Sequence, residues 1–452
     1  MRKEIAALLR LAVPVVGVQL GLMLMGVVDT LMVGRVSPEA IAAVAMGNLY
    51  FYGVSIFGVG LLMALDPIIA QAVGAGDDAA IQRGVQRGIA IATALGLITM
   101  VLLLAAEPVL RLLRQPEDVV PLAALYVKLE APAQIPFYLF VVLRQTLQAR
   151  HDTTPIVASI VAANLANVVL NWVLIFGHAG FAPMGVAGSA IATMLSRWLM
   201  TLLLLALAWR GLRPYLFPWR SDALEPAALR RVVALGAPIG IQMNLEYGVF
   251  AVAGLIMGWL GTVQMAGHQV ALNLASLTFM VPLGVSAAAS VLVGNAVGRG
   301  DMAGARRAAA TSVAVGVVFM AITAVIMLAI PGMLAQAYTD VPAVAAVASV
   351  LIPIAGLFQV FDGLQVVCIG ILRGVADTRA PMLINVLGFW LIGLPVSWLF
   401  GLRLGHGPQG LWWGLTIGLI VVALILALRV RSRLAGTVER VMIDRPRQAA
   451  QP

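Results

Sequence analysis

Three acidic residues lie inside long apolar segments of the sequence, where a charged side chain is costly. They are Asp29, Glu246 and Asp362. A charge near the centre of a bilayer costs about 2.5–3.5 kcal/mol on insertion scales, so such residues usually face a cavity. A carboxyl group there can hold a proton or a metal cation, and it can attract an organic cation. The three acids predict cation-binding sites inside a membrane. A protonated carboxyl bonded to a neighbouring helix is the alternative.

Amide side chains accompany two of these acids at helical spacing. Gln242 precedes Glu246 by four residues and Gln359 precedes Asp362 by three, so each pair is expected to share a helix face. Tyr247, which follows Glu246, can add cation–π attraction. We therefore treat Gln242, Tyr247 and Gln359 as candidate neighbours of a site that would take Na⁺ or a proton at Glu246 and Asp362.

Three asparagines, Asn164, Asn167 and Asn171, lie together in another apolar segment. Asn167 and Asn171 are four residues apart and share a helix face. Their amide oxygens could ligate Na⁺ beside Asp29. Hydrogen bonds between helices, a common role for asparagine in membranes, explain them equally well.

The other charged residues in apolar segments have simpler interpretations. Asp66 is expected to cap or stabilise a kink, because the repeat described below places Ser290 at the matching position. Glu130 is expected to form an interfacial ion pair with nearby Lys128. Arg197 either pairs with an acid or extends its side chain towards the membrane surface.

Composition requires that lipid cover much of the protein. The chain has 452 residues, of which 61% are hydrophobic and 11% charged, whereas soluble domains carry about 25% charged residues. A span needs roughly 20 apolar residues. We predict an all-α polytopic membrane protein with twelve transmembrane helices, at 11–33, 48–72, 88–106, 122–146, 156–177, 185–208, 235–259, 271–296, 308–331, 346–371, 381–401 and 410–429.

Basic residues are concentrated in alternate loops. Of the 29 Lys and Arg, 23 lie at the two ends or in loops on the same side as the ends. This asymmetry predicts that both termini are cytoplasmic, in a bacterial inner membrane. The same distribution argues that the formal net charge of +9 does not serve to bind nucleic acid. The single cysteine, Cys368, excludes an internal disulfide.

The sequence repeats itself at a nearly constant offset. Four blocks recur 224 or 225 residues later: Leu11–Pro14 as Leu235–Pro238, Gln71–Asp77 as Asn295–Asp301, Asp152–Thr153 as Asp377–Thr378, and Pro183–Gly185 as Pro408–Gly410. Six spans in each repeat give a parallel, pseudo-symmetric pair of six-helix bundles, with a substrate site expected between them. The predicted domains are a first bundle at 1–208, a linker at 209–231, a second bundle at 232–430 and a cytoplasmic tail at 431–452.

At these residues the chain resembles the multidrug and toxic compound extrusion (MATE) family, in its NorM-like branch. The matching segments are Val28–Gly34, His268–Asn273, Pro282–Ser286, Val293–Gly298, Gln359–Asp362, Leu372–Gly374 and Asp377–Arg379. The resemblance implies a monomeric exporter without a cofactor, which exchanges cationic amphipathic molecules for Na⁺ or H⁺.

The resemblance also assigns site residues. It implies a cation site at Glu246 and Asp362 in the second bundle, acids that the DinF-like branch generally lacks. It implies a second site at Asp29, with Asn167, Asn171 and Thr193 as neighbours.

Two other functions are less consistent with the sequence. A flippase for lipid-linked oligosaccharides uses a related architecture, but it should present several Arg or Lys to hold pyrophosphate, and only Arg197 lies within a span. A membrane enzyme would need a catalytic constellation at one face. The sequence contains neither a phosphate-binding Gly-x4-Gly-Lys-Ser/Thr motif nor zinc spacing among its four histidines. We therefore predict a transporter and not an enzyme.

Overall fold

The computed structural model describes residues 2–444, and every regular element in that range is helical. Eleven helices within it are long and apolar enough to cross a membrane. They are α1 (Arg2–Val33), α2 continuing into α3 (Pro38–Leu62 and Leu65–Gly74), α4 (Asp78–Leu104), α8 (Thr154–Phe176), α9 (Val186–Leu207), α11 (Pro226–Leu260), α12 (Thr262–Gly298), α13 (Met302–Ala329), α15 (Pro342–Gly374), the segment Arg379–Arg403 and α18 (Gly407–Ala435). The predicted all-α membrane class is confirmed.

Shorter elements connect these helices. They are α5 (Ala106–Leu112), α6 (Val120–Glu130), η1 (Ala131–Ala133), α7 (Gln134–Ala149), α10 (Trp209–Leu216), η2 (Ser221–Leu224) and α14 (Pro331–Tyr338). Within Arg379–Arg403 the chain forms α16 (Arg379–Asn385), η3 (Val386–Gly393), α17 (Leu394–Trp398) and η4 (Leu399–Arg403), of which η3 and η4 are π-helical.

The span predicted at 122–146 is two helices in the structure. α6 ends at Glu130 and α7 begins at Gln134, with the 3₁₀ turn η1 between them. Pro132 lies in this turn, where its ring and missing N–H disfavour a continuous α-helix. Neither piece is long enough to count as a span by itself, which explains eleven long helices where twelve spans were expected.

The helix predicted at 48–72 begins ten residues earlier, at Pro38. Ser37 adopts an extended conformation, and its side chain accepts a hydrogen bond from the backbone N–H of Ala40 at 3.1 Å. Serine at the N-cap followed by proline at the first helical position is a strong start signal. The apolar periodicity alone did not reveal it.

The repeated Ala-Val-Gly-x-Gly-Asp motif forms the same tight turn twice. Gly76 and Gly300 have φ of +67° and +73°, a region that favours glycine. Asp77 and Asp301 then cap the next helices, α4 and α13. Each accepts a hydrogen bond from the backbone N–H three residues later, at 2.9 and 2.7 Å. The sequence repeat therefore encodes a helix end, a left-handed glycine and an N-cap.

Loss of either cap should destabilise the protein measurably. Replacing Asp77 or Asp301 with alanine is expected to lower the free energy of unfolding by about 1 kcal/mol, because one helical N–H loses its acceptor. Thermal unfolding of the purified protein in detergent would measure the change. Asparagine at the same positions keeps the acceptor and should restore most of the stability. Equal losses for alanine and asparagine would contradict the capping role.

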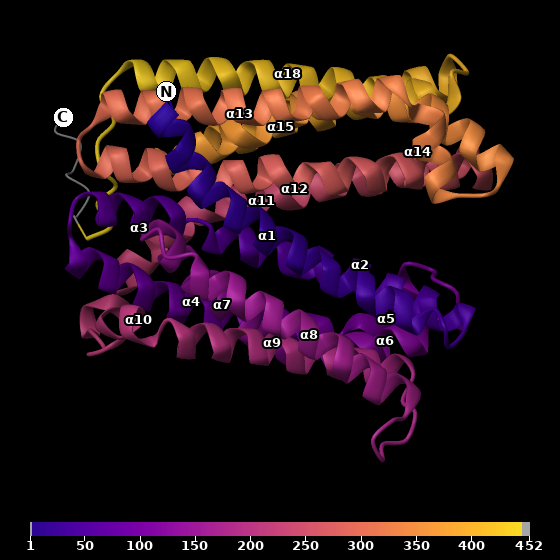
Figure 1. Ribbon diagram of the computed structural model, residues 1–452, viewed down its shortest axis with the longest axis horizontal. Coiled ribbons are helices and arrows are strands. Elements are labelled where there is room, and N and C mark those ends of the chain that lie inside the picture. The colour runs from indigo at the N-terminus through magenta and orange to yellow at the C-terminus, as the bar shows by residue number, and fades with distance from the viewer. Residues whose placement is uncertain (1, 445–452) are drawn as a thin grey trace. The chain divides into compact units, whose positions relative to one another are not determined.

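Contacts divide the described chain into two compact units. The first comprises 2–16 and 241–441. Within it α15 packs against α12, α13 and α18, which are the rose, orange and yellow helices labelled in Figure 1. Its apolar core includes Trp412, which is 1% exposed and donates its indole N–H to Nδ1 of His268 at 3.1 Å.

The second unit comprises 17–240 and 442–444. α8 packs along α9, and α4 packs along α7. The predicted linker, 209–231, lies in this unit: Gln86 of α4 donates to the carbonyls of Tyr215, Leu216 and Pro218 at 3.0–3.3 Å. The predicted tail begins inside α18, which extends to Ala435, and its part after residue 444 lies outside the described residues.

Two helices change unit along their length. α1 does so after Val16 and α11 after Gly240. These positions are 224 residues apart, like the sequence blocks, and each follows an internal proline, Pro14 or Pro238, by two residues. The first part of α1, up to Val16, therefore belongs to the unit formed mostly by 241–441. The first part of α11, up to Gly240, belongs to the unit formed mostly by 17–240.

Candidate cation-binding sites

The second unit contains a buried carboxylate held by three helices. Asp29 of α1 is 1% exposed. Its Oδ1 accepts hydrogen bonds from the amides of Asn171 at 2.6 Å and Asn167 at 3.1 Å, both on α8. Its Oδ2 accepts from the hydroxyl of Thr193 on α9 at 2.5 Å. The four side chains that the sequence and the resemblance proposed for this site therefore lie together.

Close packing of α8 and α9 allows these contacts. A Cβ added at Gly188 of α9 would lie 2.6 Å from the backbone of Leu174 on α8, so only glycine permits this approach. Asn167 and Asn171 lie one turn apart on α8, and the amide of Asn171 also donates to Oδ1 of Asn167 at 3.1 Å. The amide row is thus aligned towards one carboxylate.

One oxygen of this site has no protein donor. Oδ1 of Asn171 is buried and accepts no hydrogen bond from residues 2–444. Buried polar atoms without a partner are uncommon and require an explanation. A cation beside Asp29 would supply one, because it would be bound by carboxylate, amide and hydroxyl oxygens, which are the ligands that hard cations take.

The first unit contains a pair of acids on α11 and α15. Glu246 of α11 accepts a hydrogen bond at Oε1 from the side chain of Gln365 on α15, at 3.1 Å. Asp362, one turn before Gln365, lies on the same face of α15 and is 9% exposed. Oε1 of Gln365 is buried and accepts no hydrogen bond within the described chain. Both units therefore combine a carboxylate with an unsatisfied amide oxygen.

The candidate neighbours in this unit are placed differently from one another. Gln242 is 4% exposed and lies one turn before Glu246, while Tyr247 is half-buried. Gln359 is directed to other helices: it donates to Thr278 of α12 at 2.6 Å and accepts from Thr323 of α13 at 3.3 Å. Gln359 thus joins three helices.

Gln365 is the site residue that the sequence reasoning missed. It lies three residues after Asp362, the same spacing as Gln359 on the other side. That spacing places it on the same helix face and could have identified it.

A second ionic feature is buried in the second unit. Arg197 of α9 pairs with Glu130 of α6 at 2.9 Å, and the two side chains are 9% and 0% exposed. The guanidinium carbon of Arg197 lies 4.4 Å from the ring centre of Phe51 and 5.2 Å from that of Phe137. Arg197 therefore pairs with an acid inside the helical bundle and does not extend its side chain towards the membrane surface.

The expectation that Glu130 pairs with Lys128 was wrong. Lys128 pairs with Glu107 at 3.0 Å instead. Residues two apart on a helix point to different sides, so Lys128 and Glu130 do not face each other.

Asp66 is buried in the first turn of α3, directly after the short interruption of the helix between α2 and α3. An acid there favours the helix N-terminus.

Comparisons with known proteins agree with this arrangement. The family model described as MatE matches residues 14–173 and again 238–399. The chain is 37% identical over 430 residues to the probable multidrug resistance protein NorM of Rhizobium meliloti (strain 1021), covering 93% of this chain and 91% of that protein. It is 35% identical over 436 residues to the multidrug resistance protein MdtK of Edwardsiella ictaluri (strain 93-146), covering 95% of each.

Solved structures share the fold over almost the whole chain. The eukaryotic MATE transporter AtDTX14 matches with a TM-score of 0.87 at 23% identity, covering 96% of this chain and 99% of that one. An outward-facing MATE family transporter of the MOP superfamily matches with a TM-score of 0.87 at 18% identity, covering 96% of each. The two family matches and the extent of the similarity show that this chain belongs to the MATE family, as a multi-pass membrane transporter and not an enzyme.

Proposed function

We propose that this protein exports cationic amphipathic drugs by exchange for Na⁺ or H⁺. The observation that supports it is shared by both units: a carboxylate accepts a hydrogen bond from an amide whose own buried oxygen has no donor within residues 2–444. The pairs are buried Asp29 with Asn171 and half-buried Glu246 with Gln365. Such a pair favours a bound cation. The MATE relatives named as multidrug resistance proteins support drugs as the substrate.

Exchange follows from competition at the carboxylates. A carboxyl group in an apolar setting binds a proton, a metal ion or an organic cation, but binding of one weakens binding of another with the same charge. A coupling ion drives export only if it binds the outward-facing and inward-facing states with different affinities. We infer that Asp29, Glu246 and Asp362 carry that difference, in a monomer built from the halves 1–208 and 232–430.

The orientation that we propose is with both termini in the cytoplasm of a bacterial inner membrane. The concentration of arginine at the termini and in loops on the same side as the termini supports it. Relatives from bacteria whose names describe multidrug resistance agree with this location.

An anionic substrate is less consistent with the structure. A flippase for lipid-linked oligosaccharides would use embedded arginine or lysine to hold pyrophosphate. Arg197 is already neutralised by Glu130 at 2.9 Å. The remaining embedded charges at the candidate sites are acidic, which favours organic cations.

Transport driven by one imposed gradient at a time would test the proposal. In liposomes, the purified protein should take up ethidium in exchange for Na⁺ when a Na⁺ gradient is imposed, or in exchange for H⁺ when a pH gradient is imposed, or in both cases. Uptake should be lost when an ionophore dissipates the gradient. Liposomes without protein give the background rate. Failure of both gradients to drive any organic cation would overturn the proposal, and drive by only one would identify the coupling ion.

A further inference from the structure

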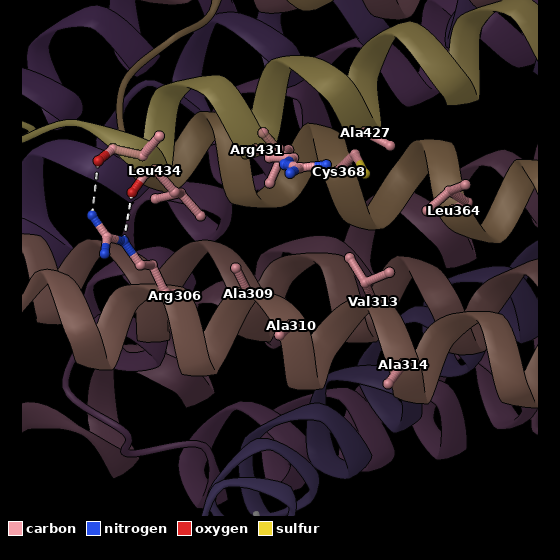
Figure 2. A pocket seen from close by; sticks show the side chains of 12 residues that line it. Arg306, Ala309, Ala310, Val313, Ala314, Leu364, Cys368, Ala427, Arg431 and Leu434 are labelled. Carbon is pink, nitrogen blue, oxygen red and sulfur yellow. Dashed lines mark hydrogen bonds between the residues drawn. The ribbon is translucent and has the colours of Figure 1, made fainter.

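A pocket in the first unit lies apart from the acidic pair and combines arginines with small apolar side chains. It is bounded by α13, α15 and α18 and has a volume of about 640 Å³ (Figure 2). Arg306 lies at one end, beside Leu434, and Arg431 lies nearer the middle, with its side chain directed towards Cys368 in the view of Figure 2. Ala310 and Ala314 of α13, Cys368 of α15 and Ala427 of α18 line the rest. This size is typical of pockets that bind small molecules.

The apolar part of the pocket belongs to a stripe that faces out of the bundle. Every fourth residue of α13 is exposed from Arg306 onward: Ala310, Ala314, Val318 and Ile322. Exposed apolar residues on a membrane-spanning helix contact lipid. The stripe begins with an arginine, continues with two alanines and then has large aliphatic residues. The alanines leave a depression next to the arginine, which a hydrocarbon chain can fill.

The pocket is positively charged around Arg431. Asp377 pairs with two arginines of α18, Arg429 at 2.8 Å and Arg433 at 3.5 Å. Arg431 lies between them in sequence and points to the other side, into the pocket (Figure 2). No acidic residue within 2–444 pairs with it. Its charge is therefore available to a ligand.

Arg306 lies at the end of the pocket where α18 terminates. Its side chain donates to the backbone carbonyls of Leu434 at 2.6 Å and Ala435 at 2.9 Å (Figure 2). These bonds cover the last carbonyls of α18, whose partial negative charge would otherwise repel an anion. They use two of the five N–H groups of the guanidinium, so others remain for an acceptor.

We propose that this pocket binds an anionic phospholipid, with the phosphate on Arg431 and an acyl chain along Ala310 and Ala314. Basic pockets between membrane helices bind lipid headgroups of this kind. The positive charges of Arg431 and Arg306 would repel the organic cations that we propose as substrates, so the pocket is a lipid site separate from transport.

Native mass spectrometry of the purified protein in detergent would test this site. Phosphatidylglycerol and phosphatidylcholine with identical acyl chains would be titrated separately. We expect preferential binding of phosphatidylglycerol. Arg431→Gln should weaken it about fivefold, the effect of one arginine near a membrane surface. Arg307→Gln is the matched control, since Arg307 is the next exposed residue after Arg306 and lies outside the pocket.

A second pair of variants tests the acyl-chain groove. Ala314→Phe should fill the depression and reduce binding, whereas Val318→Phe, one turn along the same exposed stripe and outside the pocket, should not. Equal affinity for the two lipids, or equal losses for Arg431→Gln and Arg307→Gln, would overturn the proposal. Displacement of phosphatidylglycerol by an equal concentration of sn-glycerol 3-phosphate would also overturn it, because that result describes a phosphate site without a lipid.

Discussion

Replacing Glu246 with glutamine should strongly reduce export while leaving the protein folded. Glutamine keeps the size of the side chain and an oxygen that can accept the hydrogen bond from Gln365. It removes the group that binds a proton or a cation. Because coupling free energies between ligands typically correspond to 5–150-fold changes in affinity, ethidium efflux from expressing cells should fall by about tenfold or more. Asp362→Asn should have a similar effect, since it removes the second carboxyl group of this site, one turn from Gln365 on α15.

Glu117→Gln is the control for this change. Its side chain is 75% exposed and lies 3.6 Å from Arg111 at the surface, so the same chemical substitution should leave efflux unchanged. Protein amounts in the membrane must be equal for all variants. Undiminished efflux in both Glu246→Gln and Asp362→Asn would remove the proposed role of this pair. Loss of efflux with loss of expressed protein would instead indicate a structural role.

The sequence predicted the helical bundle because lipid imposes a simple rule on length and polarity. A run of about 20 apolar residues is sufficient to identify a span, and the spans at 156–177 and 185–208 agree with α8 and α9 within two residues. The rule fails where local backbone chemistry intervenes. Pro132 interrupts one span, and the cap at Ser37 starts another helix well before its most apolar part.

The acids of the candidate sites were recognisable because charge in an apolar segment is conspicuous, but their partners were not. Asp29 meets Thr193 across 164 residues of sequence, and Glu246 meets Gln365 across 119. Such contacts depend on which helices pack together, which apolar periodicity does not specify. Thr193 was identified by family resemblance alone, and Gln365 was not identified.

Glu130 illustrates the same limit for ion pairs. A basic residue two positions away suggested a local pair, yet the true partner, Arg197, is on another helix.

The buried pair of Glu130 and Arg197 should contribute measurably to stability. Replacing Arg197 with methionine should lower the free energy of unfolding by about 3–5 kcal/mol, because it leaves the fully buried carboxylate of Glu130 without its counter-charge. Methionine preserves much of the volume beside Phe51. Unfolding of the purified protein, followed in detergent, would measure the loss.

The double variant separates charge from packing. Adding Glu130→Gln to Arg197→Met removes the uncompensated charge, so most of the lost stability should return, as replacement of whole buried pairs is often neutral. Arg111→Met is the exposed control: Arg111 lies 3.2 Å from Glu107 with half its side chain in solvent, and its loss should change stability by less than about 1 kcal/mol. Additive losses in the double variant would show that Arg197 stabilises the bundle through its contacts with the aromatic rings and not through its charge.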